Sequence, residues 1–306
     1  MTNSCTRIRV PSSTSNLGPG FDSQGIALNL YLTIDVEPTQ DSHITFTFTG
    51  EGASDLNSAA ENNLIHTAMQ FVAEREGVAL TPARLNVTNE IPLARGLGSS
   101  AAAIIAGFSA FEIITGTTLS IDKLLAYATE MEHHSDNVAA ALLGSFVVSC
   151  VADDGRVFAS RVTWPDEVRA VVVIPNFKVR TEDSRRAVPL QLSRQDAVFN
   201  IQRAALFVAA LAERRYDLLR EAMRDKLHQP FRAPLVPGLE EILSLENVDG
   251  LLGVALSGSG PTVFALATHN FDNVAQAIAA CFESRGIECA TRFLEVEKAG
   301  RVIHQR

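Results

Sequence analysis

The chain has 306 residues, 46% of them hydrophobic and 20% charged, a balance typical of a globular protein with one or two cores. Its formal net charge of −9, without a block of Lys or Arg, excludes a broad electrostatic surface for nucleic acid. No apolar run reaches the roughly 18 residues of a membrane span, and residues 1–10 lack the apolar region of a signal peptide. A cytoplasmic location is predicted because the cysteines have neither CxxC nor zinc spacing, at Cys5, Cys150, Cys281 and Cys289.

The first half of the chain mixes short alternating segments with longer segments of helical periodicity. In chain order we predict strands at 5–10, 26–36 and 44–48, a helix at 62–76, a strand at 85–87, and helices at 99–115 and 121–132. The helix at 99–115 is apolar on almost all sides, which predicts that it is buried. A polar cluster and an apolar stretch at 138–149 follow.

The second half continues with the same irregular mixture. In chain order we predict a buried strand at 168–174, helices at 197–213 and 216–226, a strand at 263–267, a helix at 273–285 and a strand at 290–296. This order favours the α+β class over a regular βαβ alternation. The pattern breaks between residues 155 and 168, which predicts two domains, at 1–160 and 161–306.

The strongest motif is Ile-Pro-Leu-Ala-Arg-Gly-Leu-Gly-Ser-Ser-Ala-Ala at residues 91–102. Gly96 and Gly98 allow a tight turn and a close approach of the backbone to a ligand. Ser99 and Ser100 then begin a helix, whose free N–H groups and dipole favour an anion such as the phosphates of ATP. The alternative is a simple helix N-cap. The segment is neither a Walker motif nor a dinucleotide fingerprint.

Two further polar segments contain paired glycines. Residues 10–22, Val-Pro-Ser-Ser-Thr-Ser-Asn-Leu-Gly-Pro-Gly-Phe-Asp, are predicted to form a long loop between two strands. Residues 256–262, Leu-Ser-Gly-Ser-Gly-Pro-Thr, form a flexible loop before a strand. Taken alone, each is also explained by an ordinary turn.

In order and spacing, the three segments together resemble the signature motifs of the GHMP family of small-molecule kinases, over about residues 8–295. The resemblance implies an N-terminal ATP-binding domain with a left-handed βαβ unit and a ferredoxin-like C-terminal domain. ATP and the substrate would bind in the cleft between them. For ATP it implies Asn62, Asn63, Pro92, Arg95, Gly96, Leu97, Gly98, Ser99, Ser100, Ala101, Gly258, Ser259 and Gly260.

Magnesium is the expected partner of ATP in such a kinase. The Ser100 hydroxyl and the Glu132 carboxylate are the predicted ligands, since Mg²⁺ prefers oxygen. Glu130 is the alternative carboxylate, two residues earlier and therefore on another face of the helix.

The acceptor substrate is indicated by residues 132–144, which resemble the EGHPDNVAPALLGG segment of the homoserine kinases within the family. The chain departs from it at His133 and Ser145, where Gly is usual, and at Ser135 and Ala140, where Pro is usual. The resemblance implies phosphorylation of the side-chain hydroxyl of L-homoserine, a step of threonine biosynthesis. Its implied binding residues are Asn16, Asp22, His134, Asn137, Arg185 and Arg232, with Arg186 as the alternative to Arg185.

The chemistry of the acceptor pocket follows from charge. Asp22 would pair with an α-ammonium group, and Arg185 and Arg232 with an α-carboxylate. Asn137 stands where some family members have a catalytic Asp, so we expect catalysis by positioning. Asp136 is the alternative general base.

Two other functions remain open at this stage. One is a kinase for another alcohol, of the mevalonate or sugar type, and the other is an inactive ligand sensor on the same fold. A homodimer is also left open.

Overall fold

The computed structural model describes residues 5–54, 56 and 63–305. Within that part of the chain, a seven-stranded sheet has the order β11-β1-β2-β4-β3, and β5 pairs with both β2 and β6. Among the described strands of this sheet, only β3 and β4 pair in parallel, and helix α1 connects them as a βαβ unit. The strands are β1 (Thr6–Asn16), β2 (Gly20–Pro38), β3 (Thr45–Gly50), β4 (Ala83–Asn89), β5 (Phe146–Val151), β6 (Val157–Val162) and β11 (Val302–Gln305).

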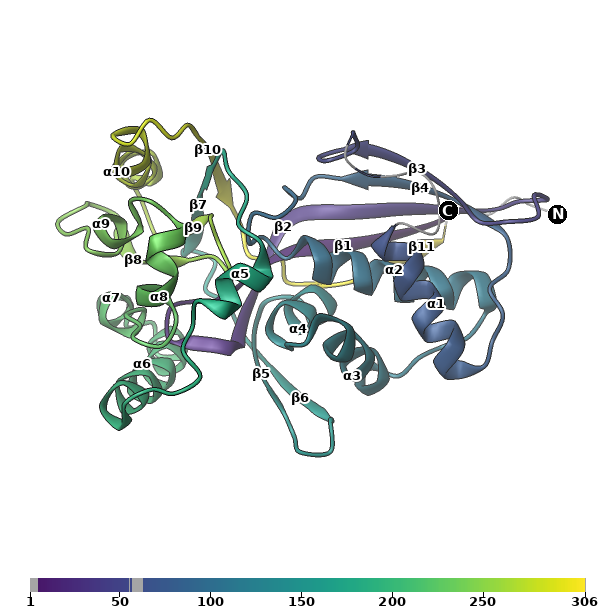
Figure 1. The fold of residues 1–306 in the computed structure, drawn as a ribbon, viewed down its shortest axis with the longest axis horizontal. Helices are drawn as coiled ribbons and strands as arrows, with labels where there is room; N and C mark the ends of the chain where they lie inside the picture. Colours follow the sequence, from purple (N-terminus) through teal and green to yellow (C-terminus); the bar gives the residue numbers. More distant parts are fainter. Residues whose placement is uncertain (1–4, 55, 57–62, 306) are drawn as a thin grey trace.

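Four helices lie against one face of this sheet (Figure 1): α1 (Leu64–Glu76), α2 (Ser99–Thr115), α3 (Ile121–Glu132) and α4 (Asp136–Leu143). Helix α2 is buried without a break from Ala101 to Phe111, as its all-round apolar sequence predicts. It runs beneath β1 and β2, so its N-terminus is fixed at the end of the sheet that faces the rest of the molecule.

A second, antiparallel sheet has the order β10-β7-β9-β8. Its strands are β7 (Arg169–Pro175), β8 (Leu251–Leu256), β9 (Val263–Ala267) and β10 (Cys289–Leu294). Its helices are α5 (Thr181–Arg186), α6 (Arg194–Ala212), α7 (Leu219–Ala222), α8 (Gln229–Arg232), α9 (Leu239–Leu243) and α10 (Phe271–Glu283). With its four strands numbered in chain order, the sheet reads 4-1-3-2, the ferredoxin-like arrangement. The predicted α+β fold is confirmed.

The second sheet is buried on both faces. In β7, Val171 and Val173 join a core with α9 and α10, whereas Ala170 and Val172 face the larger core shared with the first sheet. This explains why the sequence of β7 is a β-branched run without alternation of polarity. The two sheets are therefore joined by a hydrophobic core.

Several predicted elements differ from the structure. Residues 10–22 are not a long loop, because β1 extends to Asn16 and β2 begins at Gly20, so only a short turn separates them. The predicted helix at 216–226 is only a 3-10 turn (Tyr216–Leu218) and the single turn α7. The stretch at 138–149 divides between α4 and β5. Strands β6, β8 and β11 were not predicted. Strand β11 returns to the first sheet beside β1. The division into domains at 1–160 and 161–306 remains a prediction.

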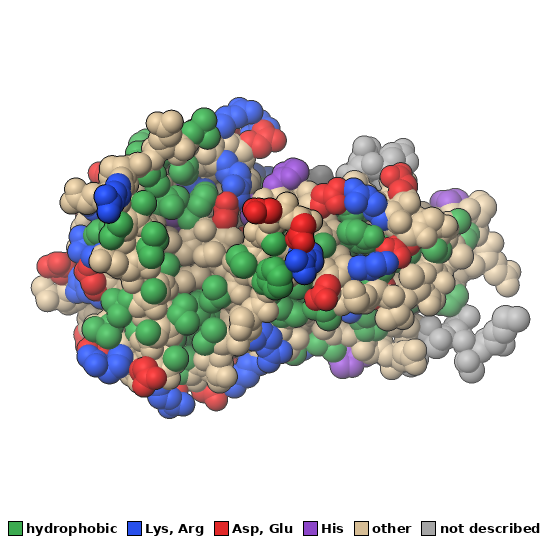
Figure 2. All heavy atoms as spheres, turned by 90° about the horizontal axis from the view of Figure 1, so that it is seen from below, with side chains coloured by type: hydrophobic (Ala, Val, Ile, Leu, Met, Phe, Trp, Pro, Cys, Tyr) green, Lys and Arg blue, Asp and Glu red, His purple; other side chains and the backbone are tan. Residues whose placement is uncertain are grey.

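The surface contains both signs of charge. On the face drawn in Figure 2, Lys and Arg side chains are interspersed with Asp and Glu, and hydrophobic side chains lie among them. No helix among the described residues has the length and hydrophobicity needed to cross a bilayer.

Phe207 of α6 tests whether the two sheets share one core. It is completely buried and packs edge-on against Phe146 of β5, with ring centroids 5.5 Å apart. We expect Phe207→Ala to lower the free energy of unfolding in urea by about 3–5 kcal/mol. The control Leu190→Ala, at a fully exposed position, should change it by less than about 0.5 kcal/mol. Equal effects of the two changes would contradict the shared core.

Candidate active site

The three glycine-rich segments meet at one end of a cavity of about 350 Å³ between the two sheets. Backbone hydrogen bonds join them: Ser13 N to the Leu97 carbonyl (3.2 Å), Gly258 N to the Ser15 carbonyl (3.2 Å), and Thr262 N to the Arg95 carbonyl (3.3 Å). We call this set of contacts, made by residues 13–16, 95–98 and 257–262, the glycine junction. It brings segments from both sheets to one place.

Gly96 needs its lack of a side chain for this contact. Its φ is 76°, and a Cβ atom there would lie 2.2 Å from the Ser257 carbonyl oxygen. That carbonyl belongs to the third glycine-rich segment. Gly96 therefore serves the packing of two loops as well as the exposure of its own N–H group.

The N-terminus of α2 presents unpaired backbone N–H groups at the cavity, an arrangement suited to an anion. None of the backbone N–H groups from residue 96 to residue 101 donates a hydrogen bond to a described residue. Helix α2 adds the positive end of its dipole at the same point. Arg95 is half-buried with its Nη1 atom lacking a partner in the described part of the chain, and burial lowers its pKa. Both features fit a bound phosphate chain.

Gly98 has a structural role in addition to the ligand-binding role that the sequence indicates. The interpretation of residues 91–102 as a phosphate loop predicts, taken alone, that Gly98→Val removes ATP binding and leaves the fold largely intact. However, Gly98 has φ 67°, and a Cβ atom would lie 2.1 Å from Ser13 Oγ and 3.0 Å from the Ser13 backbone. That expectation is wrong, because any side chain here also disrupts the packing of the loop on β1.

A carboxylate and a hydroxyl lie beside the anion site. Ser100 Oγ donates to Glu132 Oε1 at 2.5 Å, and both residues line the cavity. Burial raises the pKa of Glu132, although His134 and Ser100 oppose this rise. Glu130 instead forms an ion pair with Arg75 at the surface. The described residues contain no cluster of three or more His, Cys, Asp or Glu able to hold a metal by themselves.

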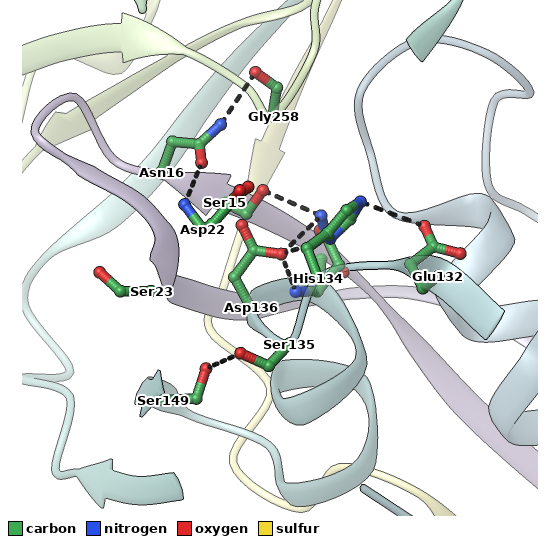
Figure 3. A network of polar contacts seen from close by, with 12 residues as sticks. Ser15, Asn16, Asp22, Ser23, Glu132, His134, Ser135, Asp136, Ser149 and Gly258 are labelled. Atoms are coloured by element: carbon green, nitrogen blue, oxygen red, sulfur yellow. Dashed lines mark hydrogen bonds and ion pairs between the residues drawn. The ribbon is translucent and has the colours of Figure 1, made fainter. Parts of the chain in front are cut away.

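His134 lies between two carboxylates at the start of α4 (Figure 3). Its Nδ1 is 2.8 Å from Asp136 Oδ1, and its Nε2 is 3.8 Å from Glu132 Oε1. Burial alone would lower the pKa of His134, but the bond to Asp136 and the charges of both carboxylates outweigh it and raise the pKa. Burial on its own would raise the pKa of Asp136, but the hydrogen bond and the charge of His134, together with hydrogen bonds from the Asn137 backbone and from Ser15, outweigh it and lower the pKa. Asp136 is thereby engaged in holding its neighbour.

Asn137 is fixed by two serines that sequence reasoning did not single out. Its Oδ1 accepts from Ser13 Oγ at 2.8 Å, and its Nδ2 donates to Ser15 Oγ at 2.9 Å. Both serines lie on β1, in a polar run that is buried rather than exposed. A buried polar run in a strand is the signal that could have identified them, since such groups need partners.

Opposite charges meet at the far end of the cavity. Arg185 forms a bidentate ion pair with Asp22, at 2.8 and 3.2 Å. Arg232 lies beside them with a 2% exposed side chain, and its Cζ is 5.2 Å from the centroid of the Phe21 ring. Burial, followed by the charge of Arg185, lowers the pKa of Arg232 to about 10, so it stays charged at neutral pH. The alternative Arg186 points to solvent.

Most of the predicted residues come together. The predicted residues of the acceptor pocket and of the metal site that line the cavity are Asn16, Asp22, Glu132, His134, Asp136, Asn137, Arg185 and Arg232. The predicted ATP-binding residues that line it are Pro92, Arg95, Gly96, Leu97, Gly98, Ser99, Ser100, Gly258 and Ser259. Ala101 and Gly260 do not line it. Asn63 caps helix α1 through His66 N, at 3.0 Å, and Asn62 lies outside the described residues. His133 and Ser145, which replace glycines, have φ of 68° and 64°, so both keep the glycine-like backbone conformation.

Unpaired N–H groups at a helix N-terminus, beside a pocket with paired charges, fit a kinase that acts on a small molecule. The sequence profile of the GHMP kinases N-terminal domain matches residues 63–145, and that of the GHMP kinases C-terminal domain matches residues 207–284. The chain is 40% identical to the homoserine kinase of Moorella thermoacetica, over 97% of this chain and 99% of that protein. It is 37% identical to the homoserine kinase of Schizosaccharomyces pombe, over 96% of each. The chain belongs to the GHMP kinase family.

Solved structures agree with this assignment. The structure is similar to the crystal structure of homoserine kinase from Cytophaga hutchinsonii, with a TM-score of 0.86 and 27% identity over 99% of this chain and 98% of that one. A mevalonate kinase shares the fold, with a TM-score of 0.69 and 15% identity over 95% of this chain and 99% of that one.

Ser99, the first residue of α2, provides a test of the anion site. Ser99→Asp should leave the fold intact, since an acidic residue is favourable at a helix N-terminus. The new charge should repel the phosphates of ATP and weaken binding at least about a hundredfold. The neutral, similarly shaped Ser99→Asn is the control. Calorimetry that finds equal ATP affinity for the two variants would exclude this loop as the phosphate site.

Proposed function

We propose that this protein transfers the γ-phosphoryl group of ATP to the side-chain hydroxyl of L-homoserine, forming O-phospho-L-homoserine for threonine biosynthesis in the cytoplasm. The single observation that carries the proposal is the Asp22–Arg185 ion pair, with Arg232 beside it, in the same cavity as the anion site. The homoserine kinases to which the chain is similar along nearly its whole length support the same reaction.

An amino acid suits this pocket because it carries both charges. Its α-ammonium group would pair with Asp22, and its α-carboxylate with Arg185 and Arg232. The Asp22–Arg185 pair would thereby be replaced by two pairs of the same kind, without leaving a buried charge uncompensated. A ligand with a carboxylate alone would leave Asp22 in competition for the arginines.

On the nucleotide side, the free N–H groups of residues 96–101 and Arg95 would bind the phosphates. Ser100 Oγ and Glu132 would hold Mg²⁺ together with phosphate oxygens and water, as this ion prefers. The ion would supply positive charge to the transferring phosphoryl group. The raised pKa of Glu132 supports this role, because a buried carboxylate without a full partner favours a cation.

Catalysis by positioning fits the pocket better than general base catalysis. Asn137 is held by Ser13 and Ser15, so its amide can orient the acceptor hydroxyl. Asp136 accepts hydrogen bonds from His134 and from the backbone of Asn137, and its lowered pKa makes it a weak base. The acceptor proton would then pass to the γ-phosphate or to water.

Coupled ADP release with a panel of alcohols tests the function. L-Homoserine should be the best substrate. L-Serine is one methylene shorter, so its hydroxyl oxygen should lie about 1.5 Å short of the position of the homoserine oxygen. Its rate of phosphorylation should therefore be about a hundredfold lower. Faster turnover of mevalonate or galactose would reject homoserine and keep the kinase assignment. Binding of ligand without any turnover would favour a sensor.

Adjacent arginines form a matched pair of variants. Arg185→Ala should raise KM for L-homoserine about a hundredfold, with KM for ATP nearly unchanged, because a bidentate carboxylate contact is lost. Arg186→Ala, at a solvent-exposed side chain, should behave like the wild type. Steady-state kinetics with each substrate varied in turn measures both. Reversal of the two results would move the carboxylate contact to Arg186.

Two glutamates on α3 form a second pair. Activity should require Mg²⁺ or Mn²⁺, and Glu132→Gln should lower kcat by about a hundredfold or more. Glu130→Gln removes only a surface ion pair and should have near-normal kcat. Kinetics at a series of Mg²⁺ concentrations checks this expectation. A large effect of Glu130→Gln alone would transfer the metal to that residue.

A further inference from the structure

His228 is a buried residue that the proposed reaction does not use directly. Its side chain is 0% exposed and lies between the β1–β2 turn and helix α8. Its Nε2 is 2.7 Å from the Gly18 carbonyl oxygen, and its Nδ1 is 3.2 Å from Arg232 Nη1. Its ring also packs against Phe21, with ring centroids 5.3 Å apart.

These two contacts determine where the proton of the imidazole lies. A guanidinium group can only donate, so Nδ1 of His228 must accept from Arg232. A carbonyl oxygen can only accept, so Nε2 must carry the hydrogen that is donated to Gly18. The side chain is therefore a neutral imidazole with both nitrogens occupied. Burial agrees with this state, because it lowers the pKa of His228 to about 4.

Asp225 holds the chain around His228 in place. Its buried carboxylate accepts from the backbone N–H groups of Leu227 (2.9 Å), His228 (3.0 Å) and Gln229 (2.6 Å). It also accepts from Asn200 Nδ2 at 2.6 Å, and the same amide is 3.4 Å from the Pro19 carbonyl oxygen. These donors satisfy the negative charge, and although Asp225 Oδ2 lies 3.6 Å from His228 Nε2, the shorter contacts of the imidazole are those to the Gly18 carbonyl and to Arg232.

The remaining donors of Arg232 indicate what the arrangement achieves. Nε donates to the Ser184 carbonyl at 3.2 Å, and Nη1 donates to the Gly258 carbonyl at 2.9 Å and to His228. Nη1 therefore has both hydrogens engaged. Nη2 has no hydrogen-bonding partner among the described residues, and Arg232 lines the cavity. One edge of the guanidinium group is held and the other is presented to a ligand.

We propose that His228 is a positioning residue, which orients Arg232 toward the α-carboxylate of the acceptor and ties it to the turn between Asn16 and Asp22. The two ends of the amino-acid pocket, one on the β1–β2 hairpin and one on α8, are then aligned through a single imidazole. This inference rests on the proposed function, since it assumes an acceptor with a carboxylate.

Two substitutions of His228 separate positioning from packing. His228→Phe keeps a planar ring against Phe21 but removes both hydrogen bonds. His228→Gln keeps one acceptor and one donor about as far apart as the two ring nitrogens. We expect His228→Phe to raise KM for L-homoserine by at least about tenfold, the cost of one hydrogen bond to a charged group, with KM for ATP unchanged. His228→Gln should recover most of this loss.

A third comparison shows whether the effect passes through Arg232. In an Arg232→Ala background, adding His228→Phe should raise KM for L-homoserine little further, because the group to be oriented is absent. Ile242→Ala, a buried change in the core of the second sheet, is the control for lost stability. It should lower Tm without a selective change in the KM for L-homoserine.

The test of the positioning role of His228 is separate from the test of the proposed reaction. Turnover of L-homoserine by the wild type tests that function alone, and the variants are compared with whichever amino-acid alcohol the wild type phosphorylates. Equal rises in both KM values, no recovery by His228→Gln, or full additivity with Arg232→Ala would each overturn the positioning role. Should His228→Phe melt below the assay temperature, His228→Leu, which also removes both hydrogen bonds, replaces it under the same criteria.

Discussion

The site depends on the backbone hydrogen bonds of the glycine junction. They join β1, the loop before α2 and the loop before β9, which come from distant parts of the chain and from both sheets. Because these contacts use carbonyl groups and some N–H groups of the loops, the N–H groups of residues 96–101 are left without a partner among the described residues. An acidic protein can thereby bind a highly charged anion without a basic surface.

The hydrophobic core gives the junction its rigidity. The second sheet has apolar side chains on both faces, so one face packs on its own helices and the other continues into the core of the first sheet. The cavity therefore lies between two parts that share a buried contact surface. Charged groups supplied by β2, α5 and α8 can then face the helix terminus of α2 at a fixed separation.

Local sequence patterns predicted the parts of the site in which chemistry is carried by the backbone. Glycines before a helix, and the polar segment that follows α3, predict an anion loop and a pocket because spacing along the chain determines their geometry. Ser13 and Ser15 bind Asn137, and His228 binds Gly18, each more than 100 residues away. The polar run of β1 indicates that its groups need partners, but the local sequence does not identify which residues these are. The same limit explains why residues 10–22 are predicted as a loop although they form the β1–β2 hairpin. Its polar residues resemble a loop, yet they are strand residues that face the cavity and the glycine junction.

The position of β11 has a consequence for biosynthesis. Its four residues pair with residues 6–9 of β1. The first sheet therefore brings together two segments that lie near opposite ends of the described chain. A growing chain would release strands β1 to β6 from the ribosome long before the strand that covers the edge of β1 exists. Until then the edge would offer unpaired N–H and carbonyl groups to other strands. The final step of folding is therefore expected only after residues 302–305 have been synthesised.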